Sequence, residues 1–175
     1  MGSQRVAIRE ARSDEIAALQ GIEAAAGRLF AEIGMGDVAD EELPSCESLR
    51  DYVSEGRAWV AVDDLDRPVG YLLAEVLDGN AHIEQVSIHP DYGRKGVGRS
   101  LIEHLAAWAG ERCMPALTLT TFADVPWNAP YYERCGFRIL SADEQTPGLR
   151  GKLEEEAARG LDRWPRVCMR RALAQ

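Results

Sequence analysis

The stretch HPDYGRKGVGRSL, residues 89–101, combines glycines with positive charge immediately before a helical pattern. Gly93, Gly96 and Gly98 allow a ligand to approach the backbone closely and permit unusual dihedral angles. The first turn of a helix also presents N–H groups without intrahelical partners, at the positive end of the helix dipole. Arginine and lysine side chains in the same stretch add charge-assisted contacts. The pattern therefore predicts an anion site, in the form of a pyrophosphate cradle.

Two well-known phosphate motifs differ from this stretch in their spacing. A Walker loop ends in Gly-Lys followed by Ser or Thr, whereas here Lys95 precedes Gly96 and Arg99 precedes Ser100. The dinucleotide fingerprint Gly-x-Gly-x-x-Gly does not fit either, because the glycine intervals run in the opposite order. On these residues alone, a glycine-rich turn with incidental surface charge is the alternative to a ligand site.

Two segments together resemble the GNAT superfamily of N-acetyltransferases. Residues 88–90, Ile-His-Pro, followed by Gly-Val-Gly at 96–98, are similar to the family's acyl-CoA signature, Gln/Arg-x-x-Gly-x-Gly/Ala after a strand. NAPYYERCGF, residues 128–137, resembles the family's C-terminal segment and follows at the right separation. The resemblance is closest over residues 57–140. One departure is Gly93, which stands at the Gln/Arg position, with the arginine shifted to Arg94.

The resemblance implies that acetyl-CoA is the co-substrate and that no metal takes part. The exposed strand edge at Val86, Ser87 and Ile88 would pair with the pantetheine arm, and the Ile88 N–H would donate to the thioester oxygen. Asn128 would contact CoA or the backbone, although asparagine also favours the start of a helix. The cradle for the pyrophosphate would consist of Arg94, Lys95, Gly96, Val97, Gly98, Arg99 and Ser100.

Acetyl transfer to an amine needs a base, because an alkylammonium with a pKa near 10 is not a nucleophile. Strand alternation predicts that His82, Glu84, Val86 and Ile88 share one face. The resemblance favours Glu84 as the base. His82 is the second candidate, since an unperturbed imidazole has a pKa near 6.5.

The departing thiolate also accepts a proton. Tyr132 lies four residues before Gly136, where the family places its tyrosine, so the resemblance implies that Tyr132 is the acid. Adjacent residues of a helix point about 100° apart, so that Tyr131 and Tyr132 cannot both face the sulfur.

Hydrophobic periodicity predicts the elements that must position these residues. A β meander followed by β-α-β units predicts a mixed α/β (α+β) sheet with helices packed on it. The resemblance adds a mostly antiparallel sheet of six to seven strands, with helices on both faces and a splay between strands 81–88 and 116–122. One N-acetyltransferase domain would span residues 1–175. Strands are predicted at 5–11, 57–64, 69–79, 81–88, 116–122, 137–140 and 166–173, and helices at 16–30, 45–56, 97–112, 127–136 and 149–164, with a loop at 32–44.

Composition limits the classes of partner. The formal charge of −9 over 175 residues argues against nucleic-acid binding, and no apolar run approaches the roughly 18 residues of a membrane span. The N-terminus shows no apolar signal segment. The chain is therefore expected in the cytoplasm, with free and mostly buried thiols and no zinc site. The cysteines, none of them in a Cys-x-x-Cys pair, are Cys46, Cys113, Cys135 and Cys168.

The expected reaction is transfer of an acetyl group to a primary amine of a small molecule or peptide, by direct attack in a ternary complex. Residues 25–56 and 141–151 are expected to set the acceptor. The acidic segment 34–42 either attracts a cationic amine or is a solvated loop. A non-catalytic acyl-CoA sensor or interaction module, and an acyltransferase using another acyl-CoA, are the alternatives. A homodimer is possible by resemblance.

Overall fold

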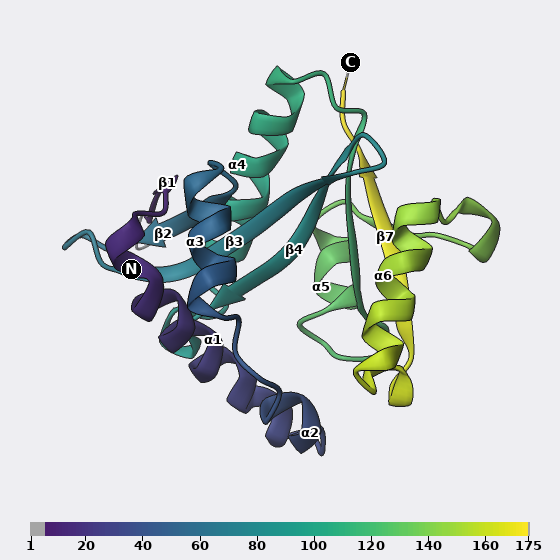
Figure 1. The fold of residues 1–175 in the computed structure, drawn as a ribbon, viewed down its shortest axis with the longest axis horizontal. Coiled ribbons are helices and arrows are strands. Elements are labelled where there is room, and N and C mark those ends of the chain that lie inside the picture. Colours follow the sequence, from purple (N-terminus) through teal and green to yellow (C-terminus); the bar gives the residue numbers. More distant parts are fainter. Residues whose placement is uncertain (1–5, 175) are drawn as a thin grey trace. The chain divides into compact units, whose positions relative to one another are not determined.

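Seven strands form a mixed sheet in the computed structural model, which describes residues 6–174 (Figure 1). They are β1 (Ala7–Glu10), β2 (Ala58–Val62), β3 (Pro68–Leu77), β4 (Asn80–Ile88), β5 (Ala116–Phe122), β6 (Arg138–Ile139) and β7 (Arg166–Ala172). Their hydrogen-bonded order is β1-β2-β3-β4-β5-β7-β6. β4 and β5 pair in parallel at Ala81–Leu117 and His82–Thr118, whereas the β1–β2, β2–β3, β5–β7 and β6–β7 pairs are antiparallel. The predicted fold class is confirmed. That β4 and β5 diverge beyond these two pairs of residues stays a prediction.

The described helices largely follow the predicted ones. They are α1 (Ile16–Ala31), α2 (Gly36–Ala39), α3 (Cys46–Ser54), α4 (Val97–Glu111), α5 (Ala129–Arg134) and α6 (Pro147–Ala158), with short 3-10 turns at Ser13–Glu15, Pro90–Tyr92, Ala142–Glu144 and Leu161–Arg163. No helix within residues 6–174 is long and apolar enough to cross a membrane.

Three predicted segments need correction or lie partly outside the described chain. The predicted loop at 32–44 contains α2, a four-residue helix too short to show a helical period. The late helix ends at Ala158 instead of Trp164, because Gly160 adopts a left-handed conformation with φ of 79°. Arg5, where the first strand was predicted to begin, lies outside the described residues.

Two compact units divide the described chain. The first comprises the described residues up to Ala74 together with Glu84–His104. The second comprises Glu75–Ile83 and the described residues from Leu105 onward. The single domain over residues 1–175 stays a prediction.

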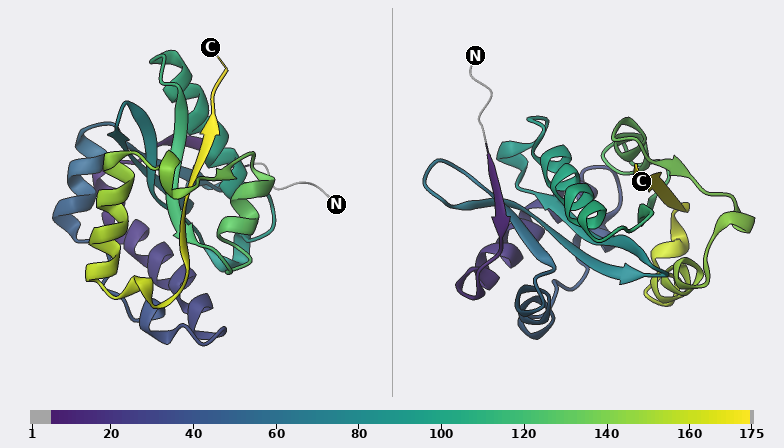
Figure 2. Two further views of the ribbon diagram at one scale, coloured as in Figure 1. Left: turned by 90° about the vertical axis from the view of Figure 1, so that its right-hand side faces the viewer. Right: turned by 90° about the horizontal axis from the view of Figure 1, so that it is seen from above.

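In the first unit, helices cover both faces of β2. Trp59 has its ring against His104 of α4, with centroids 6.2 Å apart, whereas the neighbouring strand residues belong to the core beneath α1 and α3. Alternate strand residues point to opposite faces, so α4 lies on one face and α1 and α3 on the other (Figure 2). That core comprises Ala11, Ile16, Leu19, Ile22, Leu49, Ala58, Val60, Val62, Tyr71 and Leu73.

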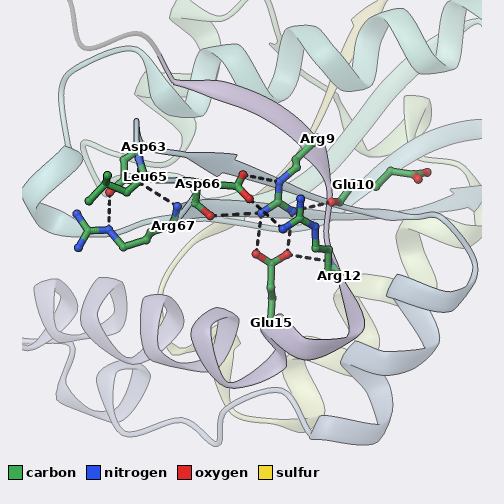
Figure 3. Close-up of polar contacts among 8 residues, drawn as sticks. All are labelled: Arg9, Glu10, Arg12, Glu15, Asp63, Leu65, Asp66 and Arg67. Carbon is green, nitrogen blue, oxygen red and sulfur yellow. Dashed lines mark hydrogen bonds and ion pairs between the residues drawn. The ribbon is translucent and has the colours of Figure 1, made fainter.

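An ion network ties β1 to the entrance of α1 (Figure 3). Arg9 donates two parallel hydrogen bonds to the Glu15 carboxylate, at 2.9 and 2.8 Å. Arg9 and Arg12 also donate to Asp66, at 3.0 and 2.9 Å. The hydrogen bond from Arg9 is the largest cause that lowers the pKa of Glu15. The ionised carboxylate thereby fixes the path of the chain into α1.

In the second unit, α5 and α6 flank β5 and β7 from opposite sides (Figure 2). Leu149 of α6 packs with Leu140 and with Cys168 of β7 in a small apolar cluster. The β3–β4 connection, Asp78-Gly79, has φ of 52° and 80° at its two central residues. Positive φ at both positions is the type I′ geometry that suits a two-residue hairpin. The Asp78 carboxylate then accepts the Gly148 N–H at 3.0 Å, at the start of α6.

Back in the first unit, β3 approaches the end of β4 and the start of α4 closely at Gly70. A Cβ added to Gly70 would lie 2.7 Å from Ile88 Cδ1, 3.3 Å from the Ser87 carbonyl oxygen and 3.4 Å from Val97 Cγ1. The His89 N–H donates to the Val69 carbonyl at 2.9 Å. Because Gly70 has no side chain, both ends of the segment that joins β4 to α4 can pack against the backbone of β3.

Replacing Gly70 tests this close approach. Gly70→Ala should lower the free energy of unfolding by about 1 kcal/mol, because the new methyl group forces its neighbours apart. The matched control is Gly21→Ala in α1, where a Cβ would meet nothing within 4 Å. This control should gain about 0.5 kcal/mol or more from helix propensity. Urea denaturation of both variants measures the difference, and a gain in Gly70→Ala equal to that of the control would contradict the packing argument.

Candidate active site

The segment between β4 and α4 contains two residues with left-handed backbone. Arg94 has φ of 60° and Gly96 has φ of 80°, whereas Gly93 is extended, with φ of −64° and ψ of 152°. Gly96 tolerates this conformation without strain, but a side chain such as that of Arg94 does so at a cost of about 1 kcal/mol. The arginine shifted from residue 93 thus occupies a strained position. The constraint at Gly93 is one of space, because a Cβ there would lie only 3.3 Å from the Pro90 carbonyl oxygen.

Backbone amides at the start of α4 are placed as an anion site requires. The Ser100 N–H bonds the Gly96 carbonyl at 3.0 Å, so the amides of residues 97–99 precede the hydrogen-bond ladder of α4. Arg94, Lys95 and Arg99 are exposed around this helix start. Their positive charge and the helix dipole act in the same sense, so the segment can bind a phosphate group.

The second half of β4 also lies in the first unit. Glu84 is exposed, while Val86 and Ile88 are half-buried and Ser87 is buried. Gln85 and Ser87 both contact Glu23 of α1, whereas Ile88 packs beside Val97 of α4. Gln85 and Ser87 therefore share the face of β4 toward α1, and Ile88 lies on the face toward α4. That His82, Glu84 and Val86 share the face of Ile88 stays a prediction.

Glu23 is the centre of a polar group that sequence reasoning missed. Its carboxylate accepts hydrogen bonds from Tyr71 at 2.7 Å, from Ser87 at 2.5 Å, and from Gln85 at 3.2 Å to each oxygen. Burial and the Glu23 charge raise the pKa of Tyr71 well above 10, so that its hydroxyl stays protonated. The available signal was an acid on the apolar stripe of α1, four residues after the buried Leu19.

His82, at the start of β4, belongs to the second unit. It is 2% exposed, and its Nδ1 lies 2.9 Å from the Thr118 hydroxyl. Burial lowers the pKa of His82 to about 4, and the nearby charge of Lys152 acts in the same direction. An imidazole with so low a pKa is a weak base at neutral pH, which leaves Glu84 as the stronger candidate.

Asn128 and Tyr132 also lie in the second unit, at the start of α5 and within it. Asn128 has an unusual backbone conformation, with φ of −111° and ψ of −116°. Its Oδ1 is buried and has no hydrogen-bond partner among the described residues. Tyr132 is buried, and its ring lies against those of Tyr131 and Phe137, at 5.5 and 5.9 Å between centroids. Gly136, with φ of 94°, ends the turn after α5 as predicted.

The predicted site residues are thus distributed over both units. The first contains Glu84, residues 86–88 and residues 94–100, whereas the second contains His82, Asn128 and Tyr132. Their roles stay predictions.

Cysteine burial differs from what the sequence predicted. All four thiols are free, but Cys46 and Cys113 are exposed and only Cys135 and Cys168 are buried. Within residues 6–174, no group of three or more His, Cys, Asp or Glu side chains is arranged to hold a metal ion.

The low pKa of His82 predicts how stability depends on pH. The unfolded chain binds a proton at this residue below about pH 6.5, but the folded chain does so only near pH 4. Between these values the unfolded state binds more protons, so stability falls as the pH falls. The wild-type protein should lose roughly 3 kcal/mol from this group between pH 7 and 4, a loss that His82→Gln lacks.

Urea denaturation at pH 7, 5.5 and 4 measures this difference. Parallel pH curves for the wild type and His82→Gln would show that His82 does not titrate as proposed.

Comparison with known proteins places these features in one family. The sequence model of the acetyltransferase (GNAT) family matches residues 25–137. The peptidyl-lysine N-acetyltransferase YjaB of Salmonella typhimurium is 33% identical over 98 residues, which span 56% of this chain and 61% of that relative. The matched segment thus covers about three fifths of the relative's length.

Solved structures show the same fold over nearly the whole chain. The PaiA N-acetyltransferase from Thermoplasma acidophilum, in complex with coenzyme A, aligns with a TM-score of 0.71 and 13% identity, covering 96% of this chain and 99% of that one. The apo form of YjaB from Escherichia coli aligns with a TM-score of 0.63 and 23% identity, covering 97% and 99%. With the family match spanning more than half of the sequence, the chain belongs to the acetyltransferase (GNAT) family.

Proposed function

We propose that this protein transfers an acetyl group from acetyl-CoA to a primary amine of a small molecule or peptide. The observation that carries the proposal is the segment from His89 to Gly96. It has two left-handed residues and exposed positive charge in front of the 15-residue helix α4. Family membership, the name of the YjaB relative and the coenzyme A bound by the PaiA neighbour support it.

The residues present fit coenzyme A chemically. Amides of residues 97–99 and the side chains of Arg94, Lys95 and Arg99 would hold the pyrophosphate. The buried Oδ1 of Asn128, which has no partner among residues 6–174, can accept a hydrogen bond from a ligand amide or hydroxyl. Val86, Ser87 and Ile88 would pair with the amides of the pantetheine arm.

Direct transfer requires the amine nitrogen to attack the thioester carbonyl carbon, after which the C–S bond breaks. Glu84 would take the proton of the attacking amine, directly or through a water molecule. Its exposure leaves it reachable by a substrate. The Ile88 N–H would stabilise the oxyanion, and Tyr132 would return a proton to the thiolate.

A turnover screen tests the proposal. Release of free CoA from acetyl-CoA should depend on the added amine in a panel of polyamines, aminoglycosides, amino acids and lysine peptides. Mass spectrometry should find the acetylated product. Binding of acetyl-CoA without turnover on any amine would instead favour a sensor or interaction module, and faster turnover with longer acyl groups would favour a different acyltransferase.

The proposed base and acid predict different kinetic signatures. Glu84→Gln should lower kcat/KM by roughly 10²- to 10⁴-fold and remove the acidic limb of the pH profile. Tyr132→Phe should keep that limb and lower kcat less, because a thiol with a pKa of about 8.5 leaves without much help. Discontinuous assays of CoA release between pH 5 and 10 compare the two variants with the wild type. A wild-type profile in Glu84→Gln would remove Glu84 as the base.

A further inference from the structure

The Glu23 carboxylate is held in place by three neutral donors of the first unit. Its Oε2 accepts from the Tyr71 hydroxyl at 2.7 Å and the Ser87 hydroxyl at 2.5 Å. The Gln85 amide lies 3.2 Å from both carboxylate oxygens and also donates to Ser87 at 2.8 Å. Because Tyr71 is 1% exposed and Ser87 is buried, these donors are themselves fixed. The carboxylate therefore has little freedom to turn away.

This arrangement orients a negative charge without neutralising it. None of the described arginine, lysine or histidine side chains forms an ion pair with Glu23. Glu15, which lies just before α1 in the first unit, instead has Arg9 as its partner. Neutral donors satisfy the hydrogen-bonding demand of this carboxylate but leave its negative charge available to a cationic ligand.

The geometry also leaves a place for that group. Oε2 accepts two short hydrogen bonds, but among the described residues Oε1 accepts only from the Gln85 amide, at the long distance of 3.2 Å. A carboxylate oxygen has two lone pairs and can accept a further hydrogen bond from an ammonium. Glu23 and Gln85 are half-buried rather than enclosed, so a solute can reach them.

We propose that Glu23 binds a second, non-reacting ammonium of the acceptor and thereby selects dicationic amines. The proposal rests on the proposed function, since it names the class of acceptor for that reaction. The reacting nitrogen must be neutral to attack and gives its proton to the proposed base Glu84, whereas a carboxylate beside a nitrogen that does not react stabilises its protonated form. Glu23 is therefore suited to the other nitrogen. Asp37, Asp40, Glu41 and Glu42, which follow α1 in the sequence, add negative charge that attracts such a cation.

A purely structural role for Glu23 predicts a different outcome. If the carboxylate served only to satisfy Tyr71 and Ser87, an amide oxygen would serve nearly as well. Glu23→Gln keeps the shape and an acceptor oxygen but removes the charge. It therefore separates the two roles when amines of equal length and different charge are compared.

The experiment measures steady-state kinetics with hexylamine and 1,6-diaminohexane. In the wild type, KM for the diamine should lie at least tenfold below that for the monoamine. In Glu23→Gln, KM for the diamine should rise by roughly 10- to 100-fold while kcat changes less than about threefold, as expected for loss of one charge-assisted hydrogen bond. KM for the monoamine should change less than about twofold. The control Glu154→Gln, at an exposed position of α6 outside the segments expected to set the acceptor, should match the wild type.

Equal KM values for the two amines in the wild type, or equal rises for both in Glu23→Gln, would overturn the proposal. If no amine is acetylated, calorimetric titration of 1,6-diaminohexane into both proteins still decides it. Binding that weakens at least tenfold in Glu23→Gln supports the cation site while the proposed function fails. Equal binding of the diamine by the wild type and Glu23→Gln, or no binding by the wild type, would show that Glu23 is not a cation site. Should the variant not fold, equal wild-type KM values for the two amines would still overturn the proposal.

Discussion

The close approach at Gly70 is the constraint on which the candidate site depends. Because β3 has no side chain at this point, Ile88 and Val97 can both rest against its backbone. The chain between them has to leave β4 and enter α4 within a few residues, and the hydrogen bond from His89 to Val69 fixes its first step. Two left-handed residues complete the turn. The position of the first amides of α4, and of the exposed cationic side chains beside them, is thus a consequence of how tightly the flanking elements pack.

Two carboxylates of the first unit illustrate how placement decides the role of a charge. Glu15 accepts two hydrogen bonds from Arg9 and one from a backbone N–H. Its charge is therefore neutralised by an ion pair that joins β1 to α1. Glu23 receives hydroxyl and amide donors, which orient the charge and leave its sign uncompensated. Both satisfy the hydrogen-bonding demand of a partly buried group. They differ in the electric field that remains, and that field is what a solute can detect.

Local patterns predicted the parts of the fold that local physics decides. The strand at 116–122 matches β5 residue for residue, since β-branched residues between turn signals suffice to mark it. The glycine segment and the turn after α5 were predicted from types and spacing. By contrast, α2 is too short to show a period, and the contacts of Glu23 join residues 48 to 64 positions apart. The burial that lowers the pKa of His82 likewise depends on packing that a single strand's alternation does not describe.

Binding of an anionic co-substrate, as proposed, would have to overcome the net charge of −9 of this acidic chain. Salt screens charges beyond about 8 to 10 Å, so a bound phosphate responds mainly to groups within that radius. Arg94, Lys95 and Arg99, together with the dipole of α4, contribute positive potential at the segment before this helix. By the same argument, the carboxylate of Glu23 acts mainly on a cation in direct contact with it. Short-range fields of opposite sign can therefore coexist in the first unit, and the net charge alone predicts neither.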